Sequence, residues 1–427
     1  MLSSHSNRTL VTAIGLLFFP RFATAQSTKA ELFGVLHDPS RLPLSSAKVE
    51  LTNTATGLTA STTTRDGGFQ FLGLPAGLYR LTITKAQFAP LRQDGITLRV
   101  GDRVGLDLAL NVSDASQTIQ VTAAPPLLQS SRGTVSFLVE QMKVVTLPLD
   151  GRNFVPLIAL SPGVNLPPGS LLPRINGSRP RVSEYIYDGI SVLQPEPGQV
   201  ALYPVIDAIE EFRVDTNSYS AEYGRSNGGV IMVNQKSGSN VLHGTLFEFF
   251  RNEKLNARNL FATTGPKPRF RRNQFGGVLG GPIQKNRTFF FADWQGTRLN
   301  TGVVRTSTLP SLAQKQGLFS TPIFDPATTH RTEIGYLRDP FPSNAIPFNR
   351  VDRAALAVLA RYPTPNTGSA TANNYRRLGN DDTVADQLDA RLDRYFGAKH
   401  RVFGRYSFLR DDSKPTRPVS TRSPISP

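Results

Sequence analysis

A strict alternation of apolar and polar residues in the C-terminal part of the chain restricts the fold more than any other feature. From Leu388 to Asp393 apolar and charged residues alternate one for one, and from Arg401 to Phe408 apolar and polar residues largely alternate again. Successive side chains of a strand point to opposite faces, so each segment presents one apolar and one polar face. Two such strands (predicted at 388–396 and 401–409) around a short turn are typical of an outer-membrane β-barrel hairpin. An ordinary sandwich hairpin is the alternative interpretation.

The N-terminus predicts export. Arg8 precedes an apolar run from Leu10 to Phe19, and Ala23-Thr24-Ala25 follows, which is the pattern of a signal peptide (residues 1–25) cleaved after Ala25. The apolar run is too short for a membrane-spanning helix, which needs roughly 20 residues. No other apolar run is as long as such a helix requires. If the mature chain spans a membrane, it must therefore do so as a β-barrel.

Composition excludes several classes of function. The chain has no cysteine, which rules out disulfides, thiolate nucleophiles and cysteine-based zinc sites. A formal net charge of +16 raises nucleic acid or anionic lipid as partners. However, the cations are dispersed, and the densest cluster, Lys267–Arg272, is short and contains a proline. The sequence therefore predicts no nucleic-acid partner.

Residues 26–112 are predicted to form a small β-sandwich. Val49 and Leu51 point to one face of a strand, and Tyr79, Leu81 and Ile83 share a face of another. Asp66-Gly67 lies between two extended runs and predicts a hairpin, since both residues of such a turn need positive φ. The stretches "GVLHDPSRLPLSSAKVELTNTATG" and "TRDGGFQFLGLPAGLYRLTI" resemble the carboxypeptidase regulatory-like domain, a transthyretin-like sandwich. The resemblance implies a structural adaptor.

Residues 113–135 have the composition of a linker. One short β-prone segment is followed by a Pro-Pro break, and such a segment can add to the sheet edge of another protein. The alternative interpretation is a last strand of the sandwich. The segment resembles the TonB box of TonB-dependent receptors, which makes its residues candidates for partner binding: Gln117, Thr118, Ile119, Gln120, Val121, Thr122 and Ala123.

Residues 136–238 alternate strands, loops and short helical pieces. Asp188-Gly189 predicts a tight turn, and Val205–Val214 predicts a short helix that enters a strand. Val230–Val233 is apolar on both faces of an extended chain, which predicts a fully buried strand.

A longer resemblance covers residues 30–410. The stretch "DAIEEFRVDTNSYSAEYGRSNGGVIMVNQKSGSN" resembles the end of the plug domain of Oar-like TonB-dependent transporters, and "LPLDGRNF", "INGSRP" and "YDGI" resemble earlier plug motifs. "HGTLFEFFRNEKLNARNLF" and "RNQFGGVLGGPIQKNRTFFFADWQGTR" resemble the first barrel strands, and "FPSNAIPFNRVD" resembles a family loop. The resemblance implies a mainly β protein with a sandwich, an α+β plug at 136–238 and the first strands of an incomplete outer-membrane β-barrel at 239–427.

This resemblance implies a position for the buried strand and a set of candidate functional residues in the plug. The strand would belong to the plug sheet with the barrel wall covering it, and the paired glycines before it would allow close approach of plug and wall. Charged plug residues, Glu210 and Glu211 included, could pair with barrel charges and hold the plug, or they could be solvated loop charges. The candidate plug residues are Asp188, Gly189, Glu222, Tyr223, Gly224, Arg225, Gly228 and Gly229.

The implied function is that of a TonB-dependent outer-membrane receptor. It would contact outer-membrane lipid, bind or take up a large extracellular substrate (a peptide, protein or glycan), and be energised through TonB in the periplasm. Proline within residues 117–123, such as at Ile119, should then impair uptake most, because it removes a backbone donor. Barrels of this type have about 22 strands, whereas residues 242–427 supply about six. We therefore expect the N-terminal part of a longer protein, or a truncated product.

Two other classes of function are alternatives. A secreted or surface β-rich binding or adhesion protein without transport activity would show the same sandwich and strands. A zinc peptidase would use His330-Arg331-Thr332-Glu333, but zinc needs a third ligand and usually a general base. No phosphate-binding loop and no Gly-x-Ser-x-Gly elbow occurs. The sequence therefore predicts no enzyme, no catalytic residue, no metal and no cofactor.

Overall fold

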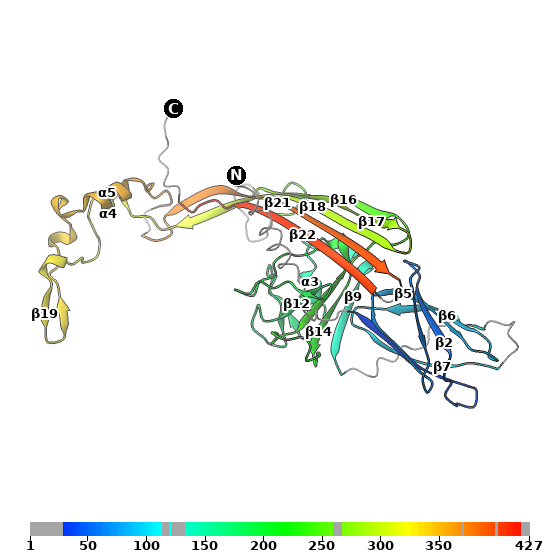
Figure 1. Ribbon diagram of the computed structural model, residues 1–427. Helices are drawn as coiled ribbons and strands as arrows, with labels where there is room; N and C mark the ends of the chain where they lie inside the picture. The colour runs from blue at the N-terminus through cyan, green and yellow to red at the C-terminus, as the bar shows by residue number, and fades with distance from the viewer. Residues whose placement is uncertain are drawn as a thin grey trace, which may run out of the picture. The chain divides into compact units, whose positions relative to one another are not determined.

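The computed structural model describes residues 29–112, 119–121, 133–258, 267–368, 371–397 and 400–419, and strands dominate it (Figure 1). The chain divides into two compact units. Within the described residues, no helix is long and apolar enough to cross a membrane. The first unit comprises Met1–Leu246, Gly277–Trp294 and Leu388–Phe408, and the second comprises Phe247–Gly276, Gln295–Gln387 and Leu409–Pro427.

The N-terminal module is a sandwich of two sheets, which we call the sandwich. One sheet has the order β4-β1-β7 and the other β3-β2-β5-β6-β8. Their inner faces share one apolar core, because alternate residues of each strand point toward it. Val49, Leu51, Tyr79, Leu81 and Ile83 are all buried there, which confirms the predicted faces. The strands are β1 (Ala30–His37), β2 (Lys48–Asn53), β3 (Thr59–Thr63), β4 (Gly68–Leu74), β5 (Gly77–Thr84), β6 (Leu91–Leu98), β7 (Arg103–Ala109) and β8 (Ile119–Val121).

The Asp66-Gly67 turn connects the two sheets of the sandwich. Both residues have positive φ, 47° and 74°, as the sequence predicts. The flanking strands do not form a hairpin, however, because β3 pairs with β2 and β4 pairs with β1. A single bridge between Arg65 and Gly68 closes the turn. The hairpin prediction is therefore wrong although the turn is right, since turn chemistry sets the chain reversal and not the partner of each strand.

The second module, which we call the middle module, is built on a mixed sheet with the order β13-β12-β15-β14-β9. β12 runs parallel to β15, and β14 is antiparallel to both β15 and β9. The predicted helix entering a strand is a short 3-10 turn, η1, that continues into β14. The elements are β9 (Val135–Glu140), α2 (Gln141–Thr146), α3 (Val155–Ile158), β10 (Val164–Asn165), β11 (Arg174–Ile175), β12 (Glu184–Tyr187), β13 (Ile190–Ser191), η1 (Ile206–Ala208), β14 (Ile209–Asn217) and β15 (Val230–Gln235).

Strand β15 contains the apolar run, and its four apolar residues are at most 1% exposed, which confirms a fully buried strand. Ile231 and Val233 pack into the middle module's own core. Val230 and Met232 point to the other face, where Val100 of the sandwich packs on them. The expectation that the barrel wall covers these faces is therefore wrong. One face is covered from within the module and the other by the sandwich.

The glycines before β15 also differ from expectation. A Cβ at Gly228 would meet Ser183, and one at Gly229 would meet Ile175, so both glycines relieve crowding inside the middle module. The close approach to the long strands occurs at Gly238 instead. A Cβ there would lie 2.3 Å from the carbonyl oxygen of Phe290 and 2.6 Å from that of Gly281. Backbone meets backbone at this point, which only glycine permits.

Five strands form a further sheet, the long-strand sheet, with the order β16-β17-β18-β21-β22 (Figure 1). The predicted alternation is confirmed: Asp389, Arg391 and Asp393 are buried, whereas Leu388 and Leu392 are exposed. Four of the five strands, at 15 to 22 residues, are longer than the roughly 10 residues expected for a membrane strand, so the segment yields five rather than six. They are β16 (His243–Asn252), β17 (Phe270–Gln284), β18 (Thr288–Ser307), β21 (Tyr375–Phe396) and β22 (His400–Lys414).

A long connection of the second unit joins β18 to β21. It carries short helices and one small hairpin, and its Arg350 guanidinium forms two hydrogen bonds with the Asp325 carboxylate. The segment that resembles a family loop, 341–352, lies here. The elements are α4 (Leu312–Lys315), η2 (Pro326–Thr328), β19 (His330–Thr332), β20 (Gly335–Leu337), η3 (Pro342–Asn344), η4 (Phe348–Arg350) and α5 (Arg353–Ala360).

Candidate functional site

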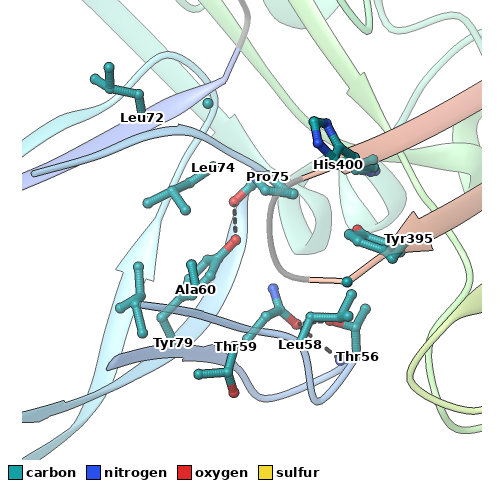
Figure 2. Close-up of a pocket in the computed structure, with 15 residues that line it drawn as sticks. Thr56, Leu58, Thr59, Ala60, Leu72, Leu74, Pro75, Tyr79, Tyr395 and His400 are labelled. Atoms are coloured by element: carbon teal, nitrogen blue, oxygen red, sulfur yellow. Dashed lines mark hydrogen bonds between the residues drawn. The ribbon is translucent and has the colours of Figure 1, made fainter. Parts of the chain in front are cut away.

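A cavity of about 170 Å³ lies between the sandwich and the hairpin of β21 and β22 (Figure 2). Tyr79 contributes one wall, and its hydroxyl donates a hydrogen bond to the carbonyl of Pro75 at 2.8 Å. Burial raises the pKa of Tyr79 to about 12, so the phenol stays neutral. Tyr395 and His400 contribute the opposite wall. Because ligand pockets usually measure about 300–1,000 Å³, this space is a gap at a contact between modules rather than a ligand site.

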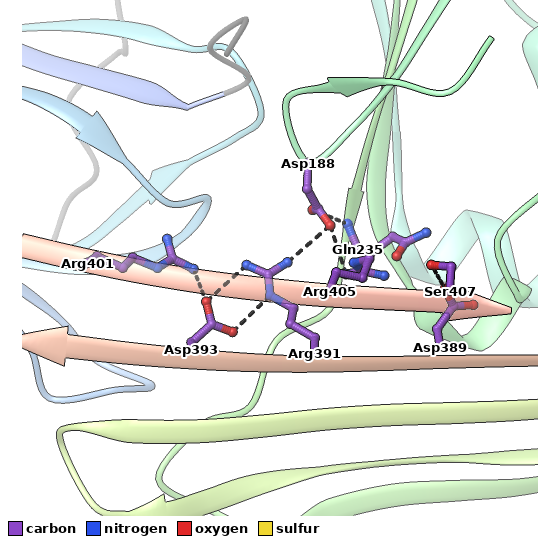
Figure 3. Close-up of polar contacts among 8 residues, drawn as sticks. All are labelled: Asp188, Gln235, Asp389, Arg391, Asp393, Arg401, Arg405 and Ser407. Atoms are coloured by element: carbon purple, nitrogen blue, oxygen red, sulfur yellow. Dashed lines mark hydrogen bonds and ion pairs between the residues drawn. The ribbon is translucent and has the colours of Figure 1, made fainter. Parts of the chain in front are cut away.

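The stronger candidate is a buried ionic cluster centred on Asp188, which we call the latch (Figure 3). Asp188 and Gly189 form the predicted tight turn between β12 and β13, with φ of 49° and 92°. One carboxylate oxygen of Asp188 accepts a hydrogen bond from the backbone N–H of Gln235 at 3.1 Å. The other lies 3.2 Å from Nη1 of Arg391 and 2.8 Å from Nη2 of Arg405. The turn thus ties the middle module to strands β21 and β22.

The arginines of the latch have further acidic partners on the same strands. Asp393 accepts hydrogen bonds from Arg391 at 2.8 and 3.2 Å, and from Arg401 at 2.7 Å. Arg391 and Arg401 also lie over the ring of Phe403, with centroid distances of 4.8 and 5.9 Å. Figure 3 shows the two strands presenting these groups toward Asp188. The charges form a chain from the middle module along the inner face of the hairpin.

Burial makes the latch energetically important. The side chains of Asp188 and Arg391 are 7% and 6% exposed, and that of Arg405 is 14% exposed. Taking such charges out of water is costly, and the pairs recover that cost only while both partners are present. Removing one partner of a buried pair typically costs about 3–5 kcal/mol. The latch therefore favours one position of the middle module against the hairpin.

The other predicted plug residues lie apart from the latch. Glu222 to Arg225 belong to the loop between β14 and β15, where Tyr223 packs against the cluster that contains Val100. Arg225 has a φ of 59°, and a Cβ at Gly224 would meet nothing within 4 Å. The structure thus brings together Asp188 and Gly189 but not the rest. Any functional role of the loop residues stays a prediction.

The TonB-box-like segment is described only in part. Strand β8 is the edge strand of the second sandwich sheet and pairs in parallel with Leu91–Gln93 of β6. This backbone position matches the alternative interpretation of the segment as a last sandwich strand. The remaining candidates, Gln117, Thr118, Thr122 and Ala123, lie outside the described residues, as does the predicted signal peptide. Partner binding by the segment stays a prediction.

Sequence reasoning did not name Arg391, Arg405 or Asp393 as site residues. The alternation along the strands placed them on the polar face, but no local signal paired them with Asp188, which lies far away in the sequence. The buried ion pair of Asp102 and Arg213 was also not predicted, because these two residues lie far apart in the sequence and no local pattern links them. The combination of an acidic residue in a turn and a charged strand face elsewhere in the chain is the signal that could have predicted these ion pairs.

The zinc hypothesis gains no support from the structure. His330 lies in an exposed hairpin, and its Nδ1 is 3.0 Å from the carbonyl oxygen of Thr328. Across the described residues, no group of three His, Asp or Glu side chains could hold a metal ion.

Two regions of the chain match known domain families, and these matches define the class of protein. Residues 31–111 match the model of the carboxypeptidase regulatory-like domain. Residues 234–424 match the model of the outer membrane beta barrel domain. The long-strand sheet is therefore barrel wall, and the protein belongs to the outer membrane.

A relative of known class identifies the family within the outer-membrane β-barrel proteins. The TonB-dependent transporter Oar of Myxococcus xanthus is 30% identical over 311 residues, which are 67% of this chain and 29% of the relative. This homology, with the two domain matches, confirms the resemblance to Oar-like TonB-dependent receptors. The chain spans less than a third of the relative's length.

Parts of two solved structures align with this chain. A mutant of the ferric enterobactin receptor PfeA from Pseudomonas aeruginosa aligns with 65% of this chain and 33% of its own, at 13% identity and a TM-score of 0.37. The outer membrane transporter YddB from Escherichia coli aligns with 61% of this chain and 31% of its own, at 14% identity and a TM-score of 0.36.

Proposed function

We propose that this chain belongs to a TonB-dependent receptor that binds or takes up a large extracellular substrate, and that it is not an enzyme. The observation that carries the proposal is the latch. Buried ion pairs hold the turn of this module to the inner face of barrel strands, which supports its assignment as a plug. The middle module, residues 136–238, is therefore the proposed plug, and breaking the latch would be part of moving it.

Energy for that movement would come through TonB in the periplasm. We propose that residues 117–123 bind TonB by backbone pairing. Strand β8 is the last strand of its sheet among those described, so one backbone edge faces β6 and the other can accept a further strand. This mode of binding depends on backbone N–H groups rather than on particular side chains.

The test is binding of the purified periplasmic domain of TonB to the native protein in detergent. We expect Ile119→Pro to abolish binding, because proline removes a backbone donor in the middle of the pairing segment. Leu128→Pro is the matched control, since it adds a proline to the same linker outside residues 117–123. Binding of the Ile119→Pro variant at wild-type strength would contradict the assignment.

A receptor without transport activity is the second candidate. The observation in its favour is the pairing of β8 with β6, which gives the segment a structural role in the sandwich. This candidate predicts that the native protein in the outer membrane does not bind the TonB domain at all, with or without the proline.

A further inference from the structure

Two separate loops of the sandwich contact the rest of the first unit. The loop at 99–102, between β6 and β7, contacts the middle module. The loop at 54–57, between β2 and β3, contacts the turn at 285–287 between β17 and β18. Short turns of outer-membrane barrels lie on the periplasmic side and long loops outside. Because the connections at 285–287 and 397–399 are short and that at 308–374 is long, the sandwich lies at the periplasmic turns.

The contact with the middle module is buried and specific. The Val100 side chain is 1% exposed and belongs to the apolar cluster with Met232 rather than to the sandwich core. Its backbone N–H donates a hydrogen bond to the Glu211 carboxylate. Beside it, Asp102 and Arg213 form an ion pair at 3.6 Å with both side chains at most 6% exposed. Apolar packing and charge pairing therefore fix the loop on the sheet.

The contact with the strand turn is centred on Asn240, which follows the middle module. The backbone N–H of Asn240 donates to the carbonyl of Ala55 at 3.0 Å. Its side chain donates to Oδ1 of Asn286 at 2.6 Å and accepts from the Asn286 backbone N–H at 2.8 Å. A Cβ at Gly57 would lie 2.4 Å from the same Oδ1 atom. The sandwich loop, the end of the middle module and the barrel turn meet at one point.

We propose that the sandwich is a clasp that fastens the middle module to the periplasmic turns of the barrel. It holds the module through Val100 and Asp102, and it holds the barrel through the loop at 54–57. A displacement of the module relative to the wall must then break one of these two contacts. The docking of the sandwich onto the middle module and the barrel turns does not depend on whether the protein transports a substrate. Its consequence for plug movement rests on the proposed function.

The first experiment uses the absence of native cysteines. Gly57→Cys combined with Asn286→Cys brings two thiols close together, because a Cβ at residue 57 would lie 3.3 Å from Cγ of Asn286, the atom that the sulfur of the second cysteine would replace. We expect this pair to oxidise in the outer-membrane fraction and to give a faster band on non-reducing gels that reductant removes. Gly95→Cys with Asn286→Cys is the matched control, because Gly95 also has positive φ and a Cβ there meets nothing within 4 Å. An uncrosslinked 57–286 pair, or equal crosslinking of both pairs, would overturn the clasp.

The second experiment tests the other contact. Met232→Cys introduces one thiol beneath Val100, and its labelling rate reports whether the sandwich covers it. We expect Val100→Asp in that background to raise the rate at least tenfold, because it places a carboxylate in the apolar cluster opposite Glu211. Val112→Asp is the control, since Val112 is 70% exposed. An unchanged rate with Val100→Asp would also contradict the proposal. TonB binding is measured separately, so failure of the clasp and of the proposed function can be told apart.

Discussion

Replacing Asp188 by Asn should loosen the middle module from the barrel wall. The change keeps the size of the side chain but removes its charge, so Arg405 loses its carboxylate partner in the latch while Arg391 keeps Asp393. Removing one partner of a buried pair costs about 3–5 kcal/mol. Because Arg391 keeps Asp393 and Arg405 is still attracted by Asp389, we expect the lower end of this range, about 3 kcal/mol. At about 1.4 kcal/mol per factor of ten, this corresponds to a roughly 100-fold shift in the opening equilibrium.

Native-state thiol labelling measures this shift. Gln235→Cys places a thiol beside the latch at a side chain that is 4% exposed, and the chain has no other cysteine. The fluorescence of Trp294, the only tryptophan, reports that the wall remains folded. The control is Asp386→Asn, whose pair with Arg298 is 33% and 40% exposed and should contribute less than about 1 kcal/mol. Labelling rates within twofold of each other for Asp188→Asn and the parent would refute the latch.

Two further predictions concern Glu211 in the middle module and Gly238, which lies at the end of that module. Gly238→Ala should prevent formation of the heat-modifiable folded form on gels, because the added Cβ would clash with two backbone carbonyls, whereas Gly133→Ala meets open space and should fold normally. Burial raises the pKa of Glu211 to about 7 from 4.5, so between these values the folded state binds more protons than the unfolded state and stability falls as pH rises. Urea midpoints measured across pH 4.5–7 should show this slope, and Glu211→Gln should remove it.

The sequence was most informative where local chemistry decides the structure. The alternation from Leu388 to Asp393 correctly gave the inner and outer faces, and Asp188-Gly189 correctly gave a tight turn. The beginning of β21 was missed because Tyr375–Gln387 has no apolar alternation and is held by cross-strand pairs such as Asp381 with Arg305. Long strands are thus set partly by neighbours that a local pattern does not show.

The cover of β15 could not be predicted, since it depends on contacts between modules. Val100 continues the apolar alternation of Ile96 and Leu98, so the pattern marks it as buried, but it does not show that Val100 leaves the sandwich core and packs on another module. The partners of Asp188 lie about two hundred residues later in the chain, and only the assembled sheets bring them together. Charged residues on one strand face indicate that this face points to the barrel interior. They do not indicate which module lies there.

The alternation in β21 and β22 also constrains how these strands can be inserted into the membrane. A slip of one residue in strand pairing would exchange the two faces and turn Asp389, Arg391 and Asp393 toward lipid. Arg and Lys on the lipid face cost up to about 2–4 kcal/mol each at the bilayer midplane, Asp and Glu cost less, and the cost falls toward the interfaces. The same side chains that hold the neighbouring module therefore also penalise misregistered insertion of these strands.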